Sequence, residues 1–301
     1  MSDKEAEDLK EKLNTLEENP FGVHFDPIET LKECLYHRNN EIRVRSARIA
    51  GSFPNADFID PLFRIVAEST ELDVRMAALE SLGAYLHHGR MSDYHRVEDA
   101  EWELEDDDEM SELTTEQFDA IREFMNKLVQ QDDWPDTLRG EALAHLARLD
   151  PESAAVEIDR FYRSNDEALK LGALKAIARI PSGDWEKLIL QELSRQTEDD
   201  RILHAIEAAG THRIVDAGPK LVNIIEESNN PEMREAAAEA LSHIPWADSG
   251  EQLQRFTEDR NPKVRQFAQE GLIRQFSELD EDELRDFGPD SPQGPGPQQR
   301  R

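Results

Sequence analysis

The histidines and the single cysteine are the residues that most readily carry chemistry in this chain. A di-iron centre needs several imidazole and carboxylate ligands at fixed spacing, and none of the nine histidines is followed by Glu. His87, His88 and His95 lie beside an acidic segment, but a loop does not hold metal ligands in a set geometry. Cys34 lies in a predicted helix, where a buried structural thiol is favoured over a nucleophile. We therefore expect no catalytic residue, no bound metal and no cofactor.

The charge balance limits the classes of partner. The 301 residues include 35 Lys and Arg but 66 Asp and Glu, a formal net charge of -31. Such a surface repels phosphate backbones, because nucleic-acid affinity comes largely from cations that displace counterions. We therefore expect no general nucleic-acid binding. The sequence has no apolar run of roughly 20 residues, the length needed to cross a bilayer, and no basic and apolar leader. We therefore expect a cytoplasmic protein that binds no membrane. Adaptation to high salt is an alternative explanation of the acidity.

One sequence pattern recurs along the chain and indicates the elements that position these residues. Its clearest copies are LDVRMAALESLG, NPEMREAAAEALS and NPKVRQFAQEGLI. A spacing of 31 or 32 residues separates most of the aligned copies, with one spacing of 64 that marks an insertion or a degenerate repeat. A constant period with two helical segments in each copy is typical of stacked helical hairpins. The first aligned residue of each copy, its anchor, is in turn Ile42, Val74, Leu138, Leu169, Arg201, Met233 and Val264.

Small residues follow each anchor at helical spacing. Positions four, seven and eight after Met233 are Ala237, Ala240 and Leu241, which lie on one face of an α-helix. The preceding segment of each copy supplies bulkier aliphatic residues, as in GPKLVNIIEE. These patterns predict an all-α fold, a right-handed α-solenoid of about seven hairpins, in which each hairpin buries its face against its neighbours.

The repeated pattern over residues 27–276 resembles HEAT repeats, and is similar to the short-period repeats named for phycobilisome lyases. The fifth copy departs from the pattern, because Arg201 and Ile202 replace the aliphatic-Arg pair. The resemblance implies a scaffold or adaptor that binds another protein or a peptide. A lyase-like or chaperone-like accessory protein that cradles and transfers a prosthetic group is the alternative, because such repeats serve several functions.

Three segments are expected to lie outside the repeats, which occupy residues 21–87 and 114–287. Residues 1–20 contain an amphipathic helix expected to cap the first hairpin, and residues 288–301 are rich in Pro, Gly and Gln and are expected to be disordered. Residues 88–113 form an expected acidic insertion loop. Apolar side chains interrupt its carboxylates and are expected to anchor a partner that has a basic surface: Trp102, Leu104 and Met110.

The resemblance also predicts a binding groove, because the second helix of each hairpin lines the concave surface of such arrays. Its exposed positions are expected three, six and ten residues after each anchor, and they carry a net charge of +1. His204 and His243 are expected to point into this groove. Its acids are Glu80, Glu141, Glu207, Glu239 and Glu270. Its cations are Arg45, Arg48, Arg148, Lys175, Arg179 and Arg274.

A second set of cations stands directly after the anchors, once in each copy. We expect these side chains to pair with acids or capping groups of the neighbouring repeat rather than with a ligand. The set comprises Arg43, Arg75, Arg139, Lys170, Arg234 and Arg265.

We also expect the protein to be a monomer.

Overall fold

The computed structural model describes residues 3–19, 23–52, 55–98, 113–180, 183–195, 197, 199–246 and 248–286. These residues form α-helices, one short 3-10 helix and no strand. The chain divides into two compact units, Met1–Ile177 and Ala178–Arg301, which we call unit 1 and unit 2. None of the described helices is both long enough and apolar enough to cross a membrane.

Seven helical hairpins follow one another along the described residues. After α1 (Asp3–Glu18), unit 1 contains the pairs α2 (Pro27–Leu35) and α3 (Asn40–Gly51), α4 (Ala56–Glu68) and α5 (Leu72–Glu98), α6 (Thr115–Gln130) and α7 (Asp136–Leu149), and α8 (Pro151–Tyr162) and α9 (Glu167–Arg179). The last two residues of α9 belong to unit 2. Unit 2 continues with α10 (Glu186–Glu192) and α11 (Asp200–Thr211), then η1 (Val215–Ala217), α12 (Gly218–Glu227) and α13 (Pro231–His243), and finally α14 (Ser249–Phe256) and α15 (Pro262–Asp286).

Short polar signals set where these helices begin. The side chains of Asn39 and Asn230 accept hydrogen bonds from the backbone N–H groups two residues later and cap α3 and α13. Such caps satisfy donors that have no partner within the helix. Asp150 is both the last residue before α8 and the residue that follows α7, so the turn between these helices is a single residue. Thr114 and Gln117 form a reciprocal capping box at the start of α6.

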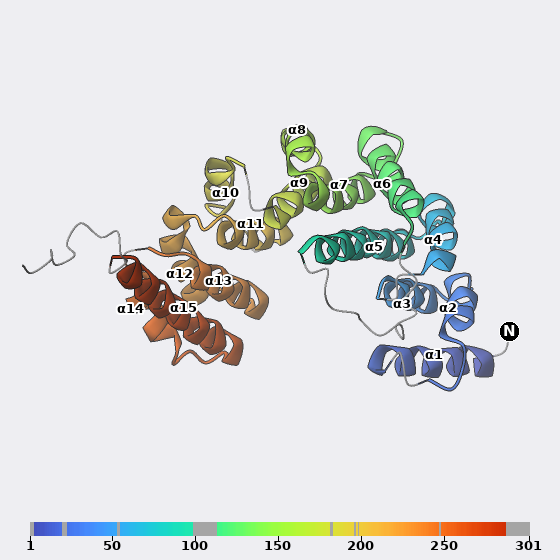
Figure 1. Ribbon diagram of the computed structural model, residues 1–301, viewed down its shortest axis with the longest axis horizontal. Coiled ribbons are helices and arrows are strands. Elements are labelled where there is room, and N and C mark those ends of the chain that lie inside the picture. The colour runs from blue at the N-terminus through green and yellow to red at the C-terminus, as the bar shows by residue number, and fades with distance from the viewer. Residues whose placement is uncertain are drawn as a thin grey trace, which may run out of the picture. The chain divides into compact units, whose positions relative to one another are not determined.

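Each unit has two layers, which Figure 1 shows for unit 1. The second helices of the hairpins pack on one another: α3 on α5 and α5 on α7 in unit 1, and α11 on α13 and α13 on α15 in unit 2. The first helices cover one side of this second-helix layer. Buried aliphatic side chains such as Leu62, Leu128, Ile189 and Leu221 point from the first helices into the core. The predicted all-α solenoid of about seven hairpins is confirmed.

Close backbone approach explains the small residues of the repeat. A Cβ added at Gly172 in α9 would lie 2.2 Å from the Cα of Gly140 in α7, and one added at Gly210 in α11 would lie 2.8 Å from the Cα of Ala240 in α13. Both distances are shorter than two carbon atoms tolerate. The second helices therefore pack at a separation that only small side chains permit.

The residue nine positions after an anchor lies where one second helix contacts the next, at the positions for which the contact is described below. In α3 it is Gly51, which faces Ser81 of α5, and in α13 it is Ser242, which faces Gly271 of α15. The full series in chain order is Gly51, Gly83, Ala147, Ala178, Gly210, Ser242 and Ile273. Six members are small, whereas Ile273 in α15 is 66% exposed and no described helix follows α15.

Helix α1 packs on the first hairpin, in contact with α2 and α3. Leu9, Leu13 and Leu16 of its amphipathic face are at most 3% exposed. Arg45 of α3 binds the carboxylate of Glu17 through two hydrogen bonds of 2.9 Å and 2.7 Å. Helix α1 thus covers the apolar surface at the beginning of the array, where no earlier hairpin is described.

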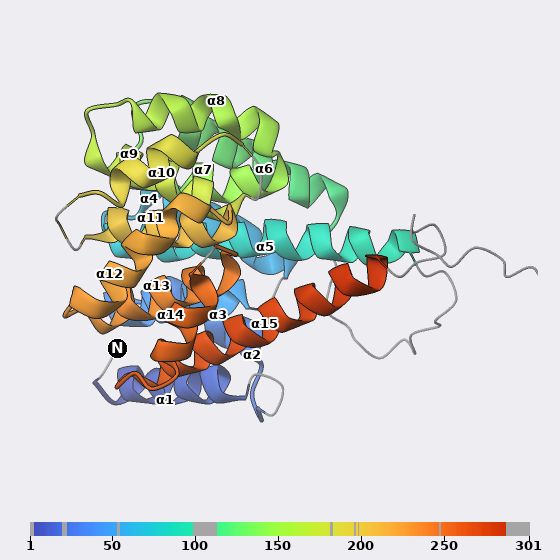
Figure 2. The ribbon, with the colours of Figure 1, turned by 90° about the vertical axis from the view of Figure 1, so that its left-hand side faces the viewer.

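The anchor spacing of 64 residues marks an insertion, because α5 and α6 belong to consecutive hairpins. Helix α5 continues to Glu98, and Figure 2 shows it running past the ends of its neighbours. Residues 88–98, expected to be part of a loop, are therefore helical. Residues 99–112, with the expected anchors Trp102, Leu104 and Met110, lie outside the described residues, as does the tail 288–301.

Candidate functional site

The predicted groove cations of unit 1 lie in the second-helix layer, and three of the four have intramolecular partners. Arg45 is bound by Glu17 and, at 2.7 Å, by Asn14; the hydrogen bond to Glu17 raises the pKa of Arg45 above its ordinary value. Arg148 of α7 is exposed, and its Nη2 lies 3.5 Å from Nε2 of His87 in α5. Arg48 is exposed and makes no hydrogen bond or ion pair with another described residue.

Lys175 belongs to a buried ionic cluster that joins α7 to α9. Its Nζ lies 2.9 Å from Oε2 of Glu141, whose side chain is 3% exposed. His145, one turn along α7, places Nε2 3.3 Å from Oε1 of the same carboxylate. Glu141 was expected to be an exposed groove acid, and this expectation is wrong. Position three after the anchor of α7 is covered by α9, because the two helices approach at Gly140 and Gly172.

The predicted groove residues of unit 2 also make contacts within the chain. His204 Nδ1 lies 2.6 Å from Oε2 of Glu207, one turn along α11. Arg274 of α15 donates to the backbone oxygen of Ser242 at 2.8 Å, and its Nη1 lies 2.9 Å from Nδ1 of His243. Burial and the neighbouring Arg274 charge lower the pKa of His243. Arg179, at the end of α9, is half-buried. Arg274 therefore joins α15 to α13, whereas the contact of His204 lies within α11. The role of these residues in partner binding stays a prediction.

The cations that follow the anchors are structural. Four of them donate hydrogen bonds to backbone oxygens at the end of the preceding first helix or in the turn that follows it, where the helix dipole favours positive charge. The pairs are Arg75 with Val66 (2.7 Å), Arg139 with Val129 (3.5 Å), Arg234 with Ile225, and Arg265 with Asp259 (2.8 Å). Arg43 and Lys170 instead bind Asn40 and Glu167 in their own helices.

Exposed carboxylates occupy equivalent places on the three second helices of unit 2. Glu207 of α11, Glu239 of α13 and Glu270 of α15 each stand six residues after the anchor, and all three are exposed. Glu239 makes no ion pair with another described residue. The hydrophobic spacing predicted that these residues lie on the groove face. The net charge of +1 summed over all groove positions gave no sign that three successive helices carry an acid at the same position. We call Glu207, Glu239 and Glu270 the acidic row.

A hollow lies in unit 1 on the side of the first helices, where the sequence predicted no site. It is a groove of about 800 Å³ between α6 and α8, with α7 as its floor. A smaller groove of about 460 Å³ lies in unit 2 between the segment that follows α10 and α12. No signal in the sequence marked either groove, because their width depends on how far apart successive first helices pack.

No metal-binding arrangement is present in the part of the chain that the structure describes, where no group of three or more His, Cys, Asp or Glu side chains has suitable geometry. Cys34 is completely buried in α2. Burial raises the pKa of its thiol to about 11, so the nucleophilic thiolate is scarce at neutral pH.

Comparison with solved structures returns helical-repeat proteins. YibA of E. coli is 14% identical, with 91% of this chain and 98% of that chain covered and a TM-score of 0.47. An engineered protein is 18% identical, with 84% and 98% covered and a TM-score of 0.39. A designed armadillo repeat protein in complex with the peptide (KR)4 is 18% identical, with 82% and 99% covered and a TM-score of 0.34. No curated protein sequence matches the chain.

The family comparison agrees with the hairpins described above. Residues 186–273 match the family model for HEAT repeats. This range covers α10 to α14 and the first half of α15, so it includes three consecutive hairpins of unit 2. The hairpins of unit 1 repeat the same two-layer packing, and their anchors have the same spacing except across the insertion after α5. The three matched hairpins of this chain are therefore HEAT repeats.

Proposed function

We propose that this protein is a scaffold that binds a basic segment of another protein along the second-helix layer of unit 2, without chemistry of its own. HEAT-repeat arrays suit protein binding in general, because stacked hairpins present a long continuous surface. The observation that carries the proposal is the acidic row, in which three successive helices present an exposed carboxylate at the same repeat position.

The spacing of the acidic row suits an extended partner segment. Packed helices lie about 8–10 Å apart, and an extended chain advances about 3.3 Å per residue. A cation at every third residue of the partner would therefore meet Glu207, Glu239 and Glu270 in turn. The interactions that these carboxylates already make are local: Glu207 contacts His204, and Glu270 accepts a hydrogen bond from Gln266 at 2.9 Å. A partner cation can replace them at small cost.

Two further contacts are expected from the sequence. Arg48 and Arg148 are both exposed in the second-helix layer of unit 1, and we expect Arg48 to meet acidic groups of a partner. The segment that contains Trp102 is expected to add an aromatic anchor among carboxylates. Deletion of residues 99–112 tests this second contact: lower partner affinity supports it, and unchanged affinity after both the deletion and Trp102→Ala removes it.

The acidic row is tested with labelled peptides and the full chain. One peptide carries Lys at every third position, and a second carries the same residues with the lysines clustered. At physiological salt, we expect the spaced peptide to bind more tightly by fluorescence anisotropy. The triple variant Glu207→Gln, Glu239→Gln, Glu270→Gln should weaken its binding about tenfold. Three exposed pairs at about 0.5 kcal/mol each give about 1.5 kcal/mol, and about 1.4 kcal/mol corresponds to a factor of ten.

A matched triple variant controls for the loss of three negative charges. Glu186→Gln, Asp216→Asn and Glu251→Gln neutralise exposed acids of unit 2 outside the row. The control should bind the spaced peptide with nearly wild-type affinity. Equal weakening by both triples would contradict a defined row and would indicate general attraction to an acidic protein. Equal binding of the spaced and clustered peptides would contradict the proposed register.

A further inference from the structure

The groove between α6 and α8 lies in unit 1 and is formed by the side chains of three helices. Its volume of about 800 Å³ falls within the range of about 300–1,000 Å³ typical of ligand clefts. It lies on the first-helix side of the unit, away from the second-helix positions that the repeat pattern predicts for binding. Three successive helices form it: α6 and α8 are the walls, and α7 is the floor.

The floor of the groove is apolar. Leu143, Leu146 and Leu149 of α7 lie along it, and Phe118 and Ala154 extend the apolar surface onto the two walls. Leu143 is 1% exposed, whereas Leu146, Leu149 and Phe118 are half-buried. Half-buried leucines on one helix face leave apolar area that a second apolar surface can cover.

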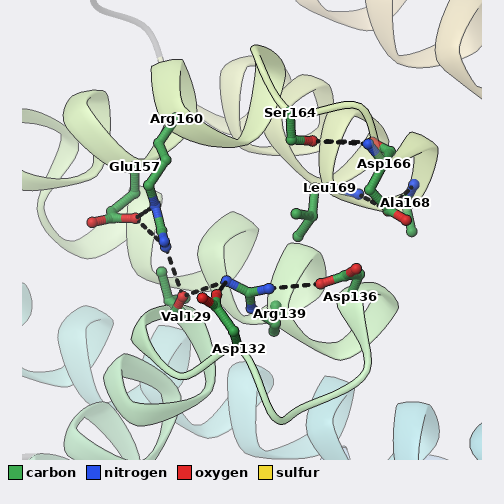
Figure 3. A network of polar contacts seen from close by, with 10 residues as sticks. All are labelled: Val129, Asp132, Asp136, Arg139, Glu157, Arg160, Ser164, Asp166, Ala168 and Leu169. Atoms are coloured by element: carbon green, nitrogen blue, oxygen red, sulfur yellow. Dashed lines mark hydrogen bonds and ion pairs between the residues drawn. The ribbon is translucent and has the colours of Figure 1, made fainter.

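Hydrogen bonds at one end of the groove join its two walls, α6 and α8. Arg160 of α8 donates from Nη2 to the backbone oxygen of Val129 near the end of α6, at 2.9 Å, and from Nε to Glu157 at 2.6 Å. Arg139 of α7 points to the same carbonyl, as Figure 3 shows. Both guanidinium groups lie over the ring of Phe161, at 5.0 Å and 5.3 Å. These contacts set the distance between α6 and α8, so the groove is already formed without a ligand.

The rim of the groove is acidic. The lining residues include one cation, Arg122, and four carboxylates: Asp119, Glu123, Asp150 and Glu157. Arg122 pairs with Asp119 at 2.8 Å and Lys127 with Glu123 at 2.8 Å, but all four side chains are at least 52% exposed. Exposed pairs along one helix contribute only about 0.3–0.5 kcal/mol, so a ligand cation can replace them.

The smaller groove of unit 2 has the opposite balance, which shows that the acidic rim is not a general property of these grooves. Its lining contains two cations, Arg195 and Lys220, and one carboxylate, Glu227. Lys220 extends from α12 to the backbone oxygen of Leu190 in α10 at 2.8 Å. This contact resembles that of Arg160 in unit 1, because both side chains join successive first helices.

We propose that the groove between α6 and α8 binds a short amphipathic helix of a partner protein, with apolar side chains on the α7 floor and Lys or Arg side chains at the acidic rim. A helix that lays its apolar face into such a groove is a recurrent form of peptide recognition. This surface is distinct from the acidic row, which takes an extended segment. The inference therefore goes beyond the proposed function and can fail independently of it.

The test uses three labelled peptides and the full chain at physiological salt. The first places Leu at positions i, i+3, i+4 and i+7, with Lys at the other positions. The second has the same composition in scrambled order, and the third replaces every Lys by Glu. We expect the first peptide to bind about tenfold or more tightly than the second, and the third to show no binding, because only the first matches both the floor and the rim.

Variants then locate the bound peptide. Asp119→Asn with Glu123→Gln removes two rim charges, and Leu146→Ala removes floor area from a half-buried position; each should weaken binding of the first peptide about fivefold or more. Glu186→Gln with Glu251→Gln removes two exposed acids of unit 2 and should leave binding unchanged. Circular dichroism and unchanged binding of the spaced-lysine peptide verify that Leu146→Ala is folded.

Two results would overturn the inference. Binding of the scrambled peptide as tight as that of the amphipathic one would mean that charge alone attracts it. Loss of binding in the Glu207, Glu239, Glu270 triple variant, with the groove variants unaffected, would place the peptide on the acidic row instead. Failure of the spaced-lysine peptide to recognise the acidic row would contradict the proposed function but leave the groove measurement intact.

Discussion

The arginines at the starts of the second helices show how single residues join the two layers. Arg234 is 5% exposed, and its Nη2 contacts both oxygens of Asp259 at 2.7 Å, while Nη1 donates to Ile225. The sequence identified these arginines and predicted acids or capping groups of the neighbouring repeat as their partners. Arg234 has such a partner in Asp259, but four of these cations also or instead bind backbone oxygens of their own hairpin. The sequence did not identify these particular partners, because the backbone oxygens carry no signature in the sequence and Asp259 lies 25 residues further along the chain.

Arg234→Met should destabilise the protein by about 3–5 kcal/mol, because it leaves a largely buried carboxylate without its cation. The Asp259 side chain is only 14% exposed. Arg139→Met should cost less, about 1–3 kcal/mol, since Asp132 and Asp136 are 82% and 35% exposed and can be hydrated. Urea unfolding measures both losses. Arg255→Met, at an exposed pair with Glu226, is the control; a loss at Arg234 no larger than this control would contradict the argument.

The buried thiol of Cys34 should be unreactive in the folded protein. Burial raises its pKa to about 11, so at pH 8 most of the thiol is protonated, and the fully buried sulfur is also inaccessible. We expect a thiol reagent to modify the native protein very slowly at pH 8 and to modify one cysteine rapidly in urea. Rapid modification of the native protein would show that α2 opens readily or that Cys34 is exposed.

At the scale of elements, the contact between α7 and α9 determines how tightly the second helices stack. The sequence predicted small residues on this face and hence close packing. It did not predict that Glu141 is buried beneath α9, since exposure at that position depends on the local separation of two helices rather than on the repeat pattern. The groove between α6 and α8 was missed for a related reason, because the distance between its walls is set by Arg160 and Val129.

Gly172→Ala should destabilise the protein even though alanine favours helices. The added Cβ would lie 2.2 Å from the Cα of Gly140, so the backbones must separate, at a typical cost of about 1–3 kcal/mol. Gly250→Ala in α14 is the matched control, because its nearest neighbour is the flexible end of Gln275 at 3.4 Å. We expect the control to be neutral or slightly stabilising. Thermal unfolding of both variants checks the difference, and equal midpoints would contradict the close crossing.

At the scale of the whole molecule, the net charge of -31 opposes folding through self-repulsion. The intramolecular pairs described above lessen this repulsion locally, but 66 acids cannot all be matched by 35 cations. The sequence therefore predicted a strongly acidic surface. The three residues of the acidic row were among the predicted groove acids. The acidic rim of the α6–α8 groove and the opposite charge balance of the α10–α12 groove emerged only from the structure.

Added salt should stabilise the protein. The Debye length falls from about 30 Å at 0.01 M to about 10 Å at 0.1 M, and screening of repulsion should outweigh the weakening of exposed ion pairs. We expect the unfolding midpoint to rise over this range, with each ~1 kcal/mol of stabilisation worth about 2–4 °C. An unchanged or falling midpoint would show that pairing already balances the repulsion. Complete unfolding at low salt would favour salt adaptation as the cause of the acidity.

Ile273 differs in size from the residues at the equivalent positions of the earlier second helices, and this difference bears on how a further helix could pack on α15. At Gly51, Gly210 and Ser242 a small side chain lies against the backbone of the next second helix. The larger side chain of Ile273 is at the equivalent position of α15 and is 66% exposed. If a further 32-residue copy were joined after α15, its second helix would contact the Ile273 side chain before it could pack closely on α15. We therefore expect an engineered hairpin joined after α15 to pack on α15 more readily in an Ile273→Gly or Ile273→Ala variant than in the wild-type chain.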